Sequence, residues 1–167
     1  MTHLMQIEAL VFLILTAPLC LYVTWTDLSQ MRIPNLSVLI LIAIFAVAGL
    51  FLLPLEVYAM RWVWALGVLV VGFLMSTIGP IAIGAGDAKF AAALSLFIAK
   101  GDGLQFLVLF AGVLLASWLV HRIAGKITLI RKATAKWASR AAGKLFPMGV
   151  ALAGTLILYL GLGAAQI

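Results

Sequence analysis

The stretch LSVLILIAIFAVAGLFLL, residues 36–53, contains no charged residue, and almost every side chain in it is apolar. About 18 such residues are what an α-helix needs to cross the roughly 30 Å hydrocarbon core of a membrane. Similar runs recur along the chain, which is 66% hydrophobic and only 10% charged, with a mean hydropathy of +1.25. Soluble domains have about 25% charged residues. The composition therefore predicts an all-α, polytopic membrane protein, a helical bundle in one domain over residues 1–167.

Charged and turn-forming residues divide the chain into six expected membrane spans. The spans are about 7–25, 36–53, 62–79, 88–99, 104–121 and 147–163. Gly67 and Gly72 in the third span should allow close contact with another helix. No cleavable signal peptide is expected, because residues 1–8 contain no Lys or Arg. The single cysteine, Cys20, is expected to be a small packing residue.

The distribution of Lys and Arg predicts the orientation of the bundle. One set of alternate connectors contains Arg32, Lys89 and the seven basic residues of 122–146, whereas the opposite set contains only Arg61 and Lys100. By the positive-inside rule the more basic side is cytoplasmic, so both chain termini are external. The acids divide in the same way: Asp27 and Asp87 fall on the cytoplasmic side, and Glu8, Glu56 and Asp102 on the external side.

The fourth span is too short to cross the membrane unaided. Residues 86–99 reach only about 21 Å as a helix, at roughly 1.5 Å per residue. Asp87, at the start of this span, should therefore lie below the cytoplasmic surface. Irregular backbone at that depth survives only where protein or a water-filled cavity surrounds it. A polar cavity open to the cytoplasm is thus expected around Asp87.

Two carboxyl groups held close together can carry out acid–base hydrolysis. They share one proton at neutral pH, so one can take a proton from water while the other donates to a peptide carbonyl. No metal or other cofactor is needed, and His3 and His121 are expected on opposite sides of the membrane. The alternatives are that Asp87 only caps the fourth span and that Asp27 only marks the interfacial end of the first.

Three motifs in this sequence resemble those of the prepilin peptidases, a family of GxGD aspartic peptidases. GAGDAKF, residues 84–90, resembles the family's GxGD segment, and DLSQMRIPN, residues 27–35, resembles its first aspartate motif. FPMGVALAGTL, residues 146–156, is similar to the final-helix pattern. The motifs occur in the family's order over nearly the whole chain. The resemblance implies that Asp27 and Asp87 are the catalytic pair and that the substrate is a prepilin or pseudopilin precursor.

The resemblance also implies roles for neighbouring residues. The start of the second span should be shaped by Arg32, Pro34 and Asn35. Gly84 and Gly86 would let the backbone approach the substrate and adopt conformations closed to residues with a Cβ, or would form a closely packed turn. Lys89 would either favour the ionised aspartate or reach the lipid headgroups.

The basic connector 122–146 has no acidic residue. Its basic residues are Arg122, Lys126, Arg131, Lys132, Lys136, Arg140 and Lys144. Steps of four residues from Lys132 to Lys144 would align on one face of a helix. An amphipathic helix on the anionic phospholipids of the cytoplasmic leaflet is therefore expected. Docking to the pilus assembly machinery is the alternative, and no motif supports binding to nucleic acid.

The cysteine content indicates a subtype. Larger bifunctional prepilin peptidases have paired CxxC motifs and also methylate the new N-terminus, whereas this chain has one cysteine. It resembles the minimal members that serve tight-adherence, or Flp, pili in the inner membrane, and methyl transfer is not expected. Two other readings remain: a protease of the signal-peptide-peptidase or presenilin type, and a non-enzymatic membrane assembly factor or small transporter.

Overall fold

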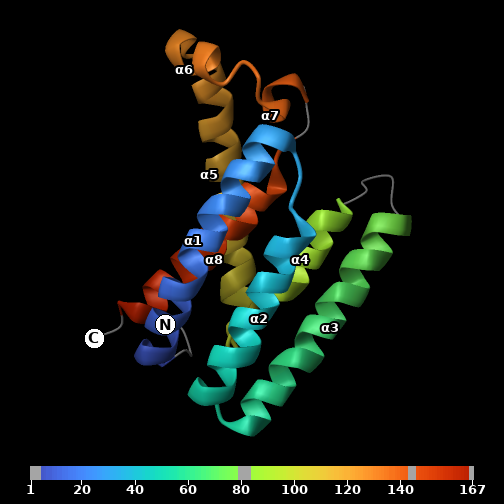
Figure 1. Cartoon of the computed structure of the whole chain (residues 1–167), viewed down its shortest axis with the longest axis vertical. Helices are drawn as coiled ribbons and strands as arrows, with labels where there is room; N and C mark the ends of the chain where they lie inside the picture. Colours follow the sequence, from blue (N-terminus) through green and yellow to red (C-terminus); the bar gives the residue numbers. More distant parts are fainter. Residues whose placement is uncertain (1–4, 79–83, 143–145, 166–167) are drawn as a thin grey trace.

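The computed structural model describes residues 5–78, 84–142 and 146–165, and the regular elements in these residues are all α-helices. The helices are α1 (Gln6–Gln30), α2 (Asn35–Leu52), α3 (Leu55–Ile78), α4 (Ala85–Ser95), α5 (Gly103–Lys126), α6 (Thr128–Ala133), α7 (Ala138–Ala141) and α8 (Met148–Ala164). The six expected spans correspond to α1–α5 and α8, so the prediction of an all-α polytopic bundle is confirmed (Figure 1).

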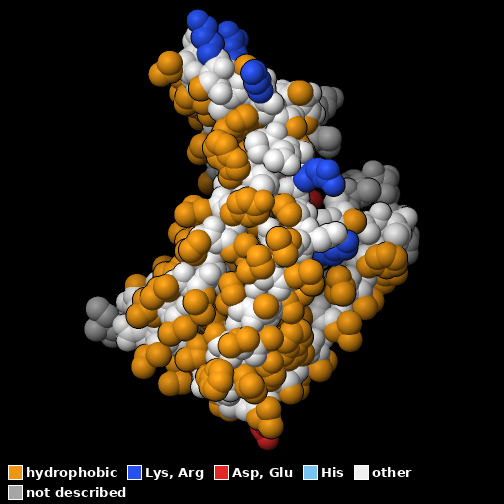
Figure 2. All heavy atoms as spheres, in the orientation of Figure 1, with side chains coloured by type: hydrophobic (Ala, Val, Ile, Leu, Met, Phe, Trp, Pro, Cys, Tyr) orange, Lys and Arg blue, Asp and Glu red, His pale blue; other side chains and the backbone are white. Residues whose placement is uncertain are grey.

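Over the described residues, four of the six spans are long and apolar enough to cross a membrane on their own. These are α1, α2, α3 and α5, whereas α8 has 17 residues and α4 has 11. At about 1.5 Å per residue, α4 extends only about 16 Å, roughly half of the hydrocarbon thickness. Large apolar side chains cover much of the surface shown in Figure 2, as lipid contact requires, and include Phe51 at 83% exposure.

Two helix pairs and an aromatic cluster organise the interior. The first helix packs along α8, and α3 packs along α4. The rings of Phe12, Phe45 and Phe97 meet between these pairs, with centroids 5.0–6.0 Å apart. Gly72 allows the close α3–α4 contact, since a Cβ there would lie 3.0 Å from the Ala88 Cβ. The prediction for Gly67 is wrong, because a Cβ there would meet nothing within 4 Å.

Two charged residues lie inside helices rather than in the expected connectors. Asp27 lies within α1, which continues to Gln30. Arg61 lies within α3, which begins at Leu55 rather than near 62, and its side chain is buried. The Arg61 Nη2 lies 3.9 Å from the Glu8 Oε2 on α1. The carboxylate of Glu8 on the neighbouring helix thus allows the guanidinium of Arg61 to be buried within α3, where the sequence pattern predicted an exposed connector.

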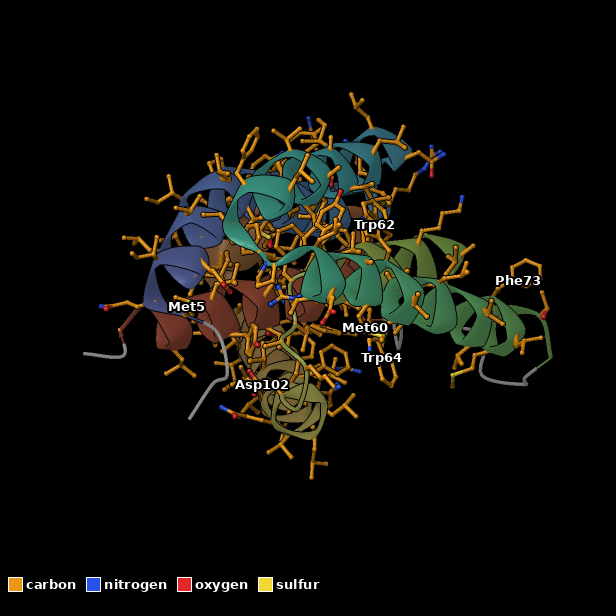
Figure 3. All side chains as sticks on the ribbon, turned by 90° about the horizontal axis from the view of Figure 1, so that it is seen from below. Met5, Met60, Trp62, Trp64, Phe73 and Asp102 are labelled. Carbon is orange, nitrogen blue, oxygen red and sulfur yellow. The ribbon has the colours of Figure 1, made fainter. Side chains whose placement is uncertain are left out.

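A buried polar cluster lies just after the C-terminal end of α4, which stops at Ser95. The carbonyl of Leu96 accepts a hydrogen bond from the Arg61 Nη1 at 3.5 Å, and the Ala99 N–H donates to the Tyr159 hydroxyl at 3.0 Å. Tyr159 in turn donates to the Asp102 Oδ2 at 2.7 Å. Figure 3 views this end of the bundle, with Asp102 labelled. Side chains therefore satisfy backbone groups that a continued helix would have paired internally.

The two ends of the described chain lie together. The Gln6 Nε2, at the start of α1, donates to the carbonyl of Ala164, at the end of α8, at 3.1 Å. Figure 1 shows both termini at the end of the bundle away from α6 and α7. This arrangement agrees with the expectation that both termini lie on one side of the membrane.

The prediction of one amphipathic helix over 122–146 is wrong. The chain leaves the helical conformation at Ile127, where ψ is 115°, and continues as α6, with six residues, and α7, with four. Arg140 is half-buried, and its Nη1 donates to the carbonyl of His121 at 2.8 Å. Such tertiary hydrogen bonds override the four-residue spacing. The exposed basic residues are Arg122, Lys126, Arg131, Lys132 and Lys136, and Lys144 lies outside the described residues.

The Tyr159 hydroxyl should stabilise the bundle. Replacing Tyr159→Phe leaves the buried Ala99 N–H without its acceptor, which costs about 1–3 kcal/mol of unfolding free energy. Thermal unfolding of the purified protein in detergent should show a lower midpoint. Tyr22→Phe is the control, because Tyr22 is 52% exposed. Equal midpoints for Tyr159→Phe and Tyr22→Phe would contradict the stabilising role of the cluster.

Candidate active site

Asp27 is held by a hydrogen bond from a helix that lies 122 positions away in the sequence. Its side chain is 5% exposed near the end of α1, and its Oδ2 accepts from the backbone N–H of Gly149 at 2.7 Å. Gly149 is the second residue of α8, where backbone N–H groups have no acceptor within the helix and the helix dipole is positive. The start of α8 therefore binds and orients a carboxylate.

Gly149 is required by the closeness of this contact. A Cβ at Gly149 would lie 2.8 Å from the Asp27 Oδ2 and 2.9 Å from the Ile33 Cδ1. Both distances are shorter than real Cβ contacts allow. Any other residue would push the carboxylate away from the helix start.

Asp87 is the third residue of α4, and its side chain lies over the turn before the helix. Gly84 occupies the N-cap position, so the reading of Asp87 as the N-cap is wrong. A Cβ at Gly84 would lie 2.7 Å from the Asp87 Oδ2. Gly84 has a φ of −55°, and Gly101 is the only described glycine with positive φ. Gly84 and Gly86 thus do not adopt conformations closed to other residues; what Gly84 provides is room for the carboxyl group.

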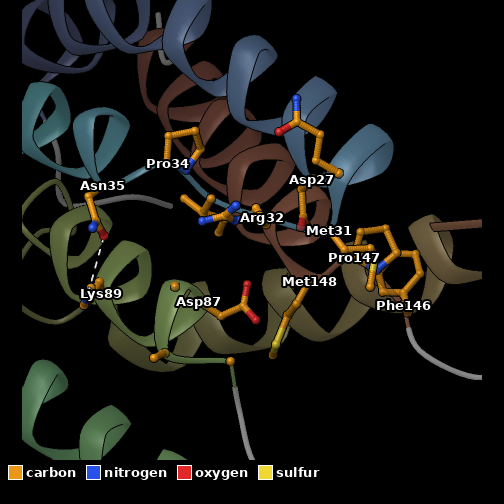
Figure 4. Close-up of a pocket in the computed structure, with 15 residues that line it drawn as sticks. Asp27, Met31, Arg32, Pro34, Asn35, Asp87, Lys89, Phe146, Pro147 and Met148 are labelled. Atoms are coloured by element: carbon orange, nitrogen blue, oxygen red, sulfur yellow. Dashed lines mark hydrogen bonds between the residues drawn. The ribbon is translucent and has the colours of Figure 1, made fainter. Parts of the chain in front are cut away.

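Asp27 and Asp87 face one cavity of about 860 Å³. Figure 4 shows the two carboxyl groups directed into the same space, with Met148 beside them. The cavity is lined by Asp27, Gln30, Met31, Arg32, Ile33, Pro34, Asn35, Gly84, Ala85, Gly86, Asp87, Lys89, Phe146, Pro147 and Met148. The expected polar cavity around Asp87 is therefore present, and it brings together the starts of α2, α4 and α8 with the end of α1.

The other motif residues form the rim of this cavity. Pro34 is the N-cap of α2, and Arg32 is exposed in the turn before it. The Lys89 Nζ donates to the Asn35 Oδ1 at 3.4 Å, which links α4 to α2 (Figure 4). Gly86 packs on Ile33, with room for an ordinary Cβ contact at 3.6 Å.

Met31 ends α1 and redirects the backbone along the side of the cavity. It is the only non-glycine residue with positive φ among the described residues, at 54°, and its N–H donates to the carbonyl of Asp27 at 2.9 Å. The left-handed conformation costs a residue with a Cβ about 1–2 kcal/mol. It ends α1 one turn after Asp27 and directs residues 32–34 across the cavity.

A second cleft, which is apolar, also contacts Asp87. It has a volume of about 500 Å³ and lies between α3 on one side and α5 and α8 on the other, over α4. Asp87 and Met148 line both this cleft and the large cavity. Gly67 lines the cleft on α3, where a Cβ would meet nothing. The carboxyl pair is thus reached both from a polar cavity and from an apolar surface within the bundle.

The fold and the cavity define a polytopic membrane protein with two carboxyl groups at one polar site. Residues 14–121, more than half of the chain, match the sequence model of the type IV leader peptidase family, and the chain belongs to this family. It is therefore a multi-pass membrane protease of the kind that removes leaders from prepilins, which confirms the family predicted from the motifs. Searches of curated proteins and of solved structures return no significant match.

The sequence motifs identified the cavity residues but missed the partner of Asp27. The sequence resemblance implies no site role for the final motif, residues 146–156. Its Phe146, Pro147 and Met148 line the cavity, and its Gly149 binds the Asp27 carboxylate. The available signal was a glycine two residues after the expected helix start at Pro147, where backbone N–H groups are free to bind an anion.

Replacing Gly149→Ala should lower prepilin cleavage by at least tenfold, because the added methyl displaces the Asp27 carboxylate and small misplacements of reacting groups cost large factors in rate. Cleavage of a co-expressed prepilin, followed by mobility shift, measures the effect. Gly161→Ala is the matched control on α8, since a Cβ there would meet nothing within 4 Å. Near-normal cleavage by Gly149→Ala would contradict this requirement.

Proposed function

We propose that this protein is an aspartic endopeptidase that removes the short leader of type IV or Flp-type prepilins, with Asp27 and Asp87 as the catalytic pair. The observation that carries the proposal is that carboxyl groups 60 positions apart in the sequence face one cavity. One is oriented by the Gly149 N–H, and the other has space reserved by Gly84. Structural caps alone would not need to share a cavity.

The proposed reaction uses water held between the two carboxyl groups. The ionised carboxylate takes a proton from this water as its oxygen attacks the peptide carbonyl carbon, and the protonated carboxyl donates its proton to the carbonyl oxygen. When the tetrahedral intermediate collapses, the C–N bond breaks and the leaving amine takes up a proton from the carboxyl group that had accepted one from water. As the new carbonyl forms, a hydroxyl of the intermediate returns its proton to the other carboxylate. Both carboxyl groups return to their starting state, so no covalent enzyme intermediate forms.

The carboxyl pair is tested by Asp27→Asn and Asp87→Asn. Each variant keeps the size of the side chain and loses acid–base function, and an asparagine at 27 still offers an oxygen to the Gly149 N–H. Cleavage of a co-expressed prepilin should fall at least about a hundredfold in each variant. Glu56→Gln is the control, because Glu56 is an exposed acid in the first turn of α3. Normal cleavage by either folded aspartate variant would refute the proposal.

The substrate's apolar helix, which follows the leader, fits the apolar cleft that ends at Asp87. A membrane-embedded helix needs an apolar surface beside the catalytic groups, and the cleft supplies one that shares the lining residues Asp87 and Met148 with the large cavity. The peptide bond between the leader and the apolar helix would then lie where the cleft meets the large cavity, beside Asp87 and Met148, which line both.

Filling the cleft should block cleavage without disturbing the fold. Gly67→Leu places a side chain in the cleft from a position with open space around it, and cleavage should fall at least tenfold. Gly112→Leu is the matched control, because Gly112 is exposed on α5, has nothing within 4 Å of a Cβ and does not line the cleft. Equal cleavage by both leucine variants and the wild type would exclude the cleft as the substrate path.

We propose that the protein lies in the inner membrane and that the cavity opens to the cytoplasmic side. Figure 2 shows Lys and Arg gathered at the end of the molecule formed by α5 and α6. Two further basic residues, Arg32 and Lys89, line the cavity. Basic side chains favour the cytoplasmic side, and anionic phospholipids would attract them there. With one cysteine in the chain, we expect leader cleavage without methyl transfer.

A further inference from the structure

A small cationic cavity lies between the end of α5 and the two short helices, separate from the aspartates. Its volume is about 250 Å³. The charged and polar side chains that line it, among the described residues, include Arg122, His121, Arg131, Ser139 and Arg140. Phe146 lines both this cavity and the larger one, and its ring packs edge-on against the ring of His121, with centroids 5.8 Å apart. Figure 1 shows α6 at the end of α5 and α7 beside the end of α1, at this end of the bundle.

The guanidinium of Arg140 is fixed in place at this cavity. Its Nη1 donates to the carbonyl of His121 at 2.8 Å, and its Nε donates to the Thr134 Oγ1 at 3.1 Å. A Cβ at Gly125 would lie 2.9 Å from that Nη1. The remaining N–H groups of a guanidinium held in this way are already oriented to bind a planar or tetrahedral oxyanion.

Two buried polar atoms at the cavity have no hydrogen-bond partner among the described residues. These are the Ser139 Oγ, in a residue only 2% exposed, and the His121 Nε2. Buried polar atoms are almost always hydrogen-bonded, so such atoms call for a missing partner. A hydroxyl can donate to an anionic oxygen that enters the cavity.

No Asp or Glu is among the described residues that line the cavity. Three arginines line it, and residues 103–146 contain no Asp or Glu. Like charges gathered in one small cavity repel one another, and an anion between them converts this repulsion into charge-assisted hydrogen bonds. A phosphate group has the oxygen atoms needed to reach several guanidinium groups and a hydroxyl at once.

We propose that this cavity binds a phosphate group, with Arg122, Arg131 and Arg140 around the anion and the Ser139 hydroxyl as a further donor. The phosphate would come either from the headgroup of an anionic phospholipid or from free phosphate. A discrete site differs from the diffuse attraction of exposed basic residues to the membrane, because it depends on particular side chains. The proposal does not depend on the peptidase mechanism.

The test uses the full-length protein, purified and delipidated in dodecyl maltoside. Native mass spectrometry measures the retention of added phosphatidylglycerol, with phosphatidylcholine for comparison, and calorimetry measures the binding of inorganic phosphate. Retention of phosphatidylglycerol without phosphate binding identifies the headgroup as the ligand. Binding of inorganic phosphate that displaces the lipid identifies free phosphate. Binding of neither ligand overturns the proposal.

A matched pair of variants separates a discrete site from diffuse attraction. Arg131→Gln and Lys132→Gln each remove one positive charge from an exposed position on α6, but only Arg131 lines the cavity. Binding should weaken about tenfold in Arg131→Gln, as loss of a charge-assisted hydrogen bond predicts, and stay unchanged in Lys132→Gln. Ser139→Ala should also weaken binding, although it leaves the net charge unchanged. Equal weakening in the two charge variants, with none in Ser139→Ala, would overturn the proposal.

Discussion

The hydrogen bond from the Gly149 N–H to the Asp27 carboxylate is the interaction on which the site depends. A carboxylate at the end of a membrane helix needs donors, and the first N–H groups of α8 need acceptors. Each satisfies the other at 2.7 Å, and the contact joins the end of α1 to the start of α8. Because these two helices pack along each other, the hydrogen bond also fixes one wall of the cavity.

The wall of the cavity that contains Asp87 depends on how α4 ends. This helix has 11 residues, so it leaves backbone groups unpaired inside the bundle rather than at a membrane surface. Arg61 and Tyr159 supply their partners, on Leu96 and Ala99. The polar cluster therefore makes a short helix stable, and a short helix lets its first turn, with Asp87, lie at a cavity reached from an apolar cleft. Polar interactions at the two ends of the bundle thus position the two aspartates.

The errors of sequence interpretation share a cause. Arg61 was expected in a loop and the segment 122–146 in one helix, because charge and four-residue spacing describe a helix as if it faced only lipid or water. In the structure Arg61 meets Glu8 on another helix, and Arg140 donates to the carbonyl of His121. Partners brought by tertiary packing change where a charged side chain can lie, and a local pattern contains no information about them.

The membrane class, the six helical segments and the family follow from the sequence alone, because apolar runs and motif order are local properties of the chain. The sequence also identified Asp27, Asp87 and the rim residues of the cavity. Only the tertiary structure decided that Gly149 orients Asp27, that Gly84 serves by its lack of a Cβ rather than by an unusual conformation, and that the basic connector folds back on α5. These features arise where residues far apart in sequence come within hydrogen-bonding or van der Waals distance, and only the packed bundle creates those distances.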